Sequence, residues 1–121
     1  MVKEYHKLVR DRVPEILDHQ NIKYSIRRVE SMEEYIHFLL AKVHEEANEL
    51  QQAITNPNGA MDNTIASEFG DLYEVMDELK RELGLDPDHI GEIQTRKREA
   101  RGGFSEHIIL DWTDDNQHST K

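Results

Sequence analysis

Hydrophobic residues recur with helical spacing along two long stretches of the chain, 31–55 and 62–83. The first stretch opens with Ser31 and, three residues later, Glu34, the capping box typical of a helix N-terminus. The second is followed by Gly84, the residue type most common just beyond a helix C-terminus. The pattern therefore predicts two long amphipathic helices.

The short connection around Asn58 and Gly59 favours an antiparallel hairpin of these two helices. Two shorter helices are also predicted. One begins near Pro14 and ends near Gln20, and the other runs from Pro87 to Arg101, where two glycines stop it. The fold class is therefore mainly α.

A minor strand pair is the remaining predicted element. Apolar and polar residues alternate from Lys23 to Val29, which is the period of a half-buried strand, and His107 to Trp112 is similarly strand-like. We expect one domain over 1–112, because a chain of 121 residues leaves no room for a second core. Residues 113–121 read as a polar tail.

The composition excludes several classes of function. A net charge of −10 disfavours binding to nucleic acid or to an anionic membrane surface. The absence of cysteine rules out thiolate metal ligands and a thiol nucleophile. No stretch approaches the roughly 18 apolar residues of a membrane span, and the N-terminus lacks the apolar core of a signal peptide. These features predict a cytoplasmic protein.

The hydrophobic content, 36% against 33% charged residues, is low for a compact monomer. It is typical of long amphipathic helices that complete their burial in an oligomer. We therefore expect a homodimer or a homotetramer in which the helices of several copies form one bundle.

Acidic residues cluster on the first long helix in the motif Glu45-Glu46-x-x-Glu49. On a helical wheel Glu46 lies about 80° from the centre of the apolar stripe, Glu49 about 140° and Glu45 about 180°. If this helix is considered alone, its acids are most simply interpreted as an ordinary solvent-exposed face. Glu46, at the border of the stripe, is the member closest to the apolar side.

The second long helix carries Glu68 and Asp71, and here Glu68 lies only about 60° from the centre of the stripe. A carboxylate among apolar neighbours is costly unless it is paired or binds a cation. In a hairpin these acids face Glu46 and Glu49, and two like charges about 4 Å apart repel by roughly 4 kcal/mol at a dielectric near 20. An Mg²⁺ or Mn²⁺ ion, which oxygen ligands suit, would relieve this repulsion.

The two acidic motifs resemble the EExxE and ExxD signature of the all-α nucleoside triphosphate pyrophosphohydrolases, the MazG-like superfamily. Two further segments, 7–16 near the N-terminus and Arg101-Gly102-Gly103-Phe104, are similar to its small stand-alone branch, usually labelled phosphoribosyl-ATP pyrophosphohydrolase-like. Together, in this order along the chain, these motifs form a specific combination. The resemblance covers the chain up to Trp112.

The resemblance implies Mg²⁺-dependent cleavage between the α and β phosphates of a nucleoside triphosphate, which yields a monophosphate and pyrophosphate, plausibly to remove non-standard nucleotides. It further implies that the metal ligands are Glu46, Glu49, Glu68 and Asp71. Glu45 would orient or activate the attacking water. Contacts to the substrate phosphates are expected from four basic residues, Lys7, Arg10, Lys97 and Arg101.

The sequence is also compatible with two other functions. The same chemistry could serve phosphoribosyl-ATP in histidine synthesis, or the chain could be a helical interaction module whose acids are only surface. Lys97 and Arg101 also suit the negative end of the helix dipole, without any ligand.

Overall fold

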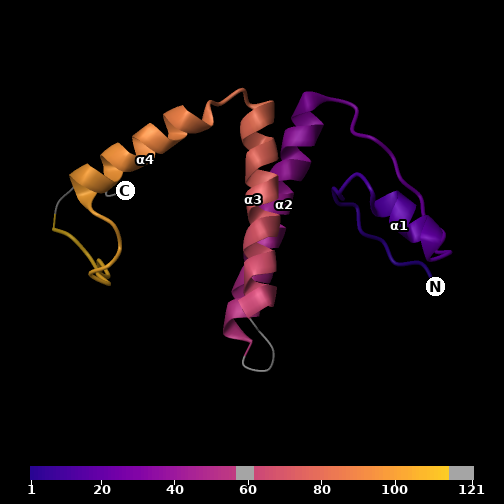
Figure 1. The fold of residues 1–121 in the computed structure, drawn as a ribbon, viewed down its shortest axis with the longest axis horizontal. Coiled ribbons are helices and arrows are strands. Elements are labelled where there is room, and N and C mark those ends of the chain that lie inside the picture. The colour runs from indigo at the N-terminus through magenta and orange to yellow at the C-terminus, as the bar shows by residue number, and fades with distance from the viewer. Residues whose placement is uncertain (57–61, 115–121) are drawn as a thin grey trace. The chain divides into compact units, whose positions relative to one another are not determined.

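Four helices make up the regular structure in a computed structural model that describes residues 1–56 and 62–114 (Figure 1). They are α1, Val13–His19; α2, Met32–Thr55; α3, Asp62–Glu82; and α4, Pro87–Arg101. The prediction of a mainly helical fold is therefore confirmed, and the four helices coincide closely with the predicted ones. By its contacts the chain divides into two units, Met1–Asp86 and the part from Pro87 onward, and each unit is described by itself.

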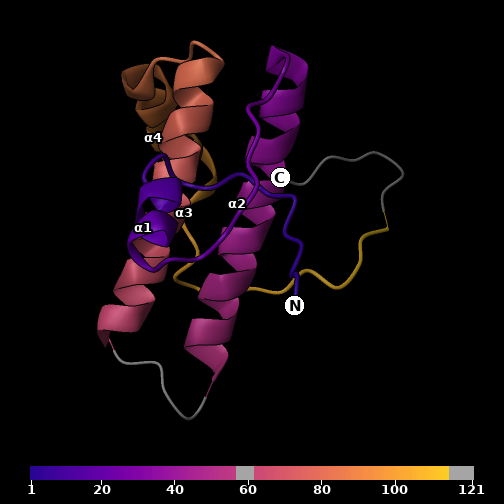
Figure 2. The ribbon, with the colours of Figure 1, turned by 90° about the vertical axis from the view of Figure 1, so that its right-hand side faces the viewer.

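The first unit is built on a hairpin in which α2 and α3 pack side by side along their lengths (Figures 1 and 2). Residues 58 and 59, where the turn is predicted, lie outside the described residues. The α2 N-terminus is capped as expected: the Ser31 hydroxyl accepts a hydrogen bond from the Glu34 backbone N–H at 3.0 Å. The Glu34 carboxylate accepts one from the Glu30 backbone N–H at 2.8 Å, one residue earlier than in the usual capping box.

The end of α3 shows why a glycine stands at position 84. Gly84 adopts a φ of 69°, a left-handed conformation that other L-residues avoid. Its N–H donates to the Arg81 carbonyl at 3.1 Å, and the next N–H, from Leu85, donates to the Lys80 carbonyl at 3.0 Å. This pair of bonds is a Schellman motif, and it ends the helix where the sequence predicts.

The hairpin alone has almost no hydrophobic core. Among the described residues Leu39 is the one fully buried apolar side chain. Each long helix leaves an apolar stripe exposed, and these uncovered stripes, spaced at helical intervals, are Leu40, Ala47 and Ile54 on α2 and Phe69, Tyr73 and Met76 on α3. Assembly into an oligomer, which would cover these stripes, stays a prediction.

The two predicted strand segments, 23–29 and 107–112, form neither helix nor strand in the described chain. A strand requires a neighbour for its backbone hydrogen bonds, and the two segments belong to different units. Their pairing therefore remains a prediction. In the described ranges no helix combines the length and apolar character that crossing a membrane requires.

Candidate metal centre

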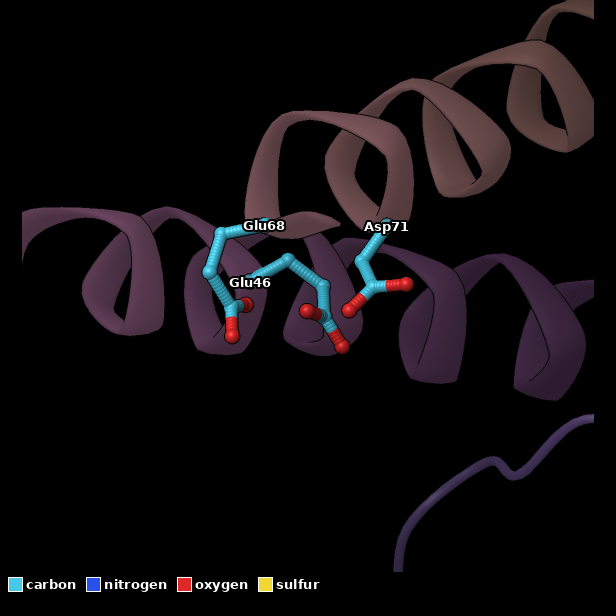
Figure 3. Close-up of side chains that lie close together, drawn as sticks. All are labelled: Glu46, Glu68 and Asp71. Atoms are coloured by element: carbon cyan, nitrogen blue, oxygen red, sulfur yellow. The ribbon is translucent and has the colours of Figure 1, made fainter. Parts of the chain in front are cut away.

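Three carboxylates from the two long helices converge on one side of the hairpin (Figure 3). They belong to Glu46 of α2 and to Glu68 and Asp71 of α3, and one oxygen of each lies within 4.8 Å of those of the other two. The antiparallel packing of α2 against α3 is what brings the two acidic motifs together. Three of the four predicted metal ligands therefore form a cluster that could hold one cation.

Glu46 is the most unusual member of this cluster because the residue is buried, with a relative exposure of 6%. Its Oε2 atom is shielded from solvent and has no hydrogen-bond partner, and the same holds for Oε2 of Glu68. Buried acceptors without a partner are costly, since they lose water and gain nothing in return. A bound cation would supply the missing partner for both.

Two acids of the cluster, Glu46 and Glu68, have raised pKa values. Burial raises the pKa of Glu46, and the charges of Glu49, Asp71 and Glu45 raise it further against the opposing effect of Lys42. Burial also raises the pKa of Glu68, with further contributions from the charges of Glu49 and Asp71 and a hydrogen bond with Glu49. For Glu46 and Glu68, burial and the neighbouring negative charges together outweigh the nearby cations.

Glu49, the fourth predicted ligand, lies outside the closest group of oxygens but near enough for its charge to act on both Glu46 and Glu68. It is half-buried on α2, one turn after Glu46.

Glu45 is held between two lysines. Its Oε1 accepts from Lys7 Nζ at 2.8 Å, and its Oε2 lies 3.1 Å from Lys42 Nζ. Partial burial acts to raise the pKa of Glu45, but the hydrogen bonds from Lys7 and Lys42 outweigh it and leave the pKa lowered. Glu45 is therefore ionised, and it is less exposed than its position opposite the apolar stripe predicts.

Lys42 also belongs to the site, although the sequence motifs assign it no role. Its ammonium lies 3.6 Å from Glu46 Oε1 as well as 3.1 Å from Glu45. The spacing of Lys42 to these acids, three and four positions along one helix, is a signal that could have identified it.

The predicted phosphate-contacting residues Lys7 and Arg10 each pair with one acid of the two acidic motifs. Besides the Lys7 contact, Arg10 Nη2 lies 2.9 Å from Asp71 Oδ1. The pKa of Lys7 is raised because its hydrogen bond to Glu45 outweighs the cost of partial burial. The structure thus places these two cations at the edge of the candidate metal site.

Lys97 and Arg101 lie on the C-terminal half of α4, in the second unit, so their contact with a ligand in the first unit stays a prediction. Arg101 lies in the last turn of α4, together with Arg98, where cations interact favourably with the helix dipole. The interpretation that needs no ligand therefore remains open for Arg101.

Comparison with protein-family models gave no match for this chain, and searches of curated proteins and of solved structures gave none either. The resemblance to the MazG-like superfamily consequently stays an interpretation of the motifs.

Proposed function

We propose that this chain is an Mg²⁺-dependent nucleoside triphosphate pyrophosphohydrolase, which cleaves the bond between the α and β phosphates and releases a monophosphate and pyrophosphate. The observation that carries the proposal is the buried Glu46, whose Oε2 has no partner, beside the carboxylates of Glu68 and Asp71. An acidic surface without a ligand has no reason to bury a carboxylate oxygen that has no partner.

The donor set fits a hard divalent cation. All the oxygens come from carboxylates, which Mg²⁺ and Mn²⁺ prefer, and the chain has no cysteine to attract a softer metal. Glu46, Glu68 and Asp71 would hold the ion, and Glu49 would complete the protein ligands. Such an ion supplies charge neutralisation of the phosphates and lowers the pKa of a bound water.

The remaining residues of the site would bind and orient. Glu45 accepts a hydrogen bond from the attacking water and fixes its direction, since two lysines keep this carboxylate ionised. An ionised carboxylate of lowered pKa orients water well but removes a proton poorly. We propose that Lys7 and Arg10, which pair with Glu45 and Asp71, contact the substrate phosphates. We propose Lys97 and Arg101 as further phosphate contacts.

We propose that the active form is a homodimer or homotetramer in the cytoplasm, with no nucleic acid or membrane partner. The support for assembly is the pair of uncovered apolar stripes on α2 and α3. Burial of apolar surface is the dominant favourable contribution to the free energy of most protein association. The proposed biological role is removal of non-standard nucleotides, and the base and sugar are left to experiment.

The test is a panel of nucleoside triphosphates, together with phosphoribosyl-ATP, incubated with the protein and Mg²⁺. Phosphorus NMR should show a monophosphate and pyrophosphate as the first products, and EDTA should stop the reaction. Glu68→Gln should be inactive, whereas Glu74→Gln, an exposed glutamate on the same helix, serves as the matched control. Orthophosphate as the sole first product, or full activity in EDTA, would contradict the proposal.

A further inference from the structure

Two cations of one short segment bind acids on both helices of the hairpin. We name residues 7–10, which precede α1, the strap (Figure 2). Lys7 at one end of the strap binds Glu45 of α2, and Arg10 at the other end binds Asp71 of α3. The strap is therefore joined to the hairpin at the border of the acidic cluster.

These ion pairs leave much of each cation free to meet another anion. The Lys7 side chain is 39% exposed and that of Arg10 is 61% exposed. An arginine carries five N–H donors, and the contact with Asp71 uses one nitrogen, Nη2. Exposed ion pairs of this kind are weak and exchange partners at little cost.

Asp71 has two competing uses in this geometry. Its carboxylate is one of the three whose oxygens converge, and it is also the partner of Arg10. Full use of Asp71 as a ligand weakens its hold on Arg10, because one carboxylate charge then serves two cations. Arg10 and Lys7 would then face a site that has gained positive charge.

We propose that the strap exchanges its counter-ions during binding: Lys7 and Arg10 neutralise Glu45 and Asp71 in the metal-free chain, and turn to phosphate oxygens of a polyphosphate once Asp71 serves as a ligand. This inference rests on the proposed metal site and adds a coupling between its two ligands. Metal and polyphosphate each raise the affinity for the other, and the strap carries part of that coupling.

The exchange predicts effects of opposite sign for Arg10→Gln. Without phosphate the variant should bind Mn²⁺ about two- to fivefold more tightly than the wild type, since a competitor for Asp71 is gone. With Mn²⁺ held in excess, it should bind inorganic pyrophosphate about two- to fivefold more weakly. A purely structural role of Arg10 would weaken both.

The experiment measures Mn²⁺ by electron paramagnetic resonance and pyrophosphate by calorimetry, both at low ionic strength. Lys7→Gln is the second variant and should also lose pyrophosphate affinity. Arg12→Gln is the control, because it removes the same charge two residues away, from a side chain that takes part in neither ion pair. Circular dichroism verifies that all variants keep the helices.

The outcomes separate the two proposals. The exchange is overturned if the wild type binds Mn²⁺ but Arg10→Gln binds it equally well or more weakly. It is also overturned if Arg12→Gln changes the two affinities as much as Arg10→Gln does. Either result leaves the proposed function standing. Failure of the wild-type chain to bind Mn²⁺ at all overturns both.

Discussion

The Tyr35 hydroxyl on α2 donates a hydrogen bond to Glu78 Oε2 on α3, with an oxygen–oxygen distance of 2.6 Å in a partly buried position. The bond joins the start of α2 to the last turns of α3. Glu78 is further held by Arg81 on its own helix. In a hairpin with so small a core, such a bond bears directly on stability.

Tyr35→Phe should lower the free energy of unfolding by about 1–2 kcal/mol, because the substitution removes a hydrogen bond to a charged group. Urea unfolding at fixed protein concentration measures the loss. Tyr5→Phe is the control, since Tyr5 is 60% exposed and lies outside both long helices. Equal losses for the two variants would show that the Tyr35 bond contributes nothing of its own.

Glu68→Gln should abolish turnover and yet raise the thermal stability of the metal-free protein. Neutralising Glu68 relieves its repulsion from Glu49 and Asp71, which we expect to be worth about 1 kcal/mol after allowance for partial exposure. Thermal melts in EDTA, beside assays with Mg²⁺, measure both effects, and Glu74→Gln is the control. A less stable variant that still turns over substrate would contradict the metal-site assignment.

The raised pKa of Glu46 predicts a pH dependence of stability. Its folded-state pKa lies above the ordinary value of 4.5, because of burial first and then neighbouring negative charge. The folded protein therefore holds this proton more tightly than the unfolded chain, and stability from this group is lost as the pH rises through the folded-state pKa. In EDTA, Glu46→Gln should gain stability over the wild type as the pH rises above 4.5.

Melts of both proteins from about pH 4 to pH 8 measure this difference. Excess Mg²⁺ should reverse the order, since the wild type then gains a ligand that Glu46→Gln holds less well. A difference that stays constant across the range, with and without metal, would mean that Glu46 is not the titrating group.

Local signals in the sequence were sufficient to predict the helices. Ser31 and Glu34 cap the start of α2, and Gly84 ends α3. Both features involve only backbone groups a few residues away, so a short stretch of sequence is enough to predict them. The convergence of Glu46 with Glu68 and Asp71 was also predictable, since it requires only helical periodicity and a hairpin. These parts of the site are encoded by short-range patterns.

The contacts of the strap could not be predicted in the same way. Lys7 and Glu45 are 38 residues apart, and Arg10 and Asp71 are 61 apart, so no periodicity relates them. Burial was also only partly predicted. The helical wheel predicts Glu68 within the apolar stripe, whereas Glu68 is only half-buried in the single chain and the adjacent Phe69 is 40% exposed.

The exposed apolar stripe of α3 leads to the last prediction, that the protein is at least a dimer. Phe69, Tyr73 and Met76 follow one another at helical spacing, and all three are at least 40% exposed in the single chain. Leaving such a row in water costs free energy that a second copy would recover. Sedimentation at micromolar concentration should therefore show a dimer or tetramer. Met76→Glu places a charge in the row and should shift the equilibrium towards the monomer. Gln52→Glu, at an exposed polar position on α2, should leave the equilibrium unchanged. A stable, active monomeric wild type would show that the missing burial is supplied within one chain.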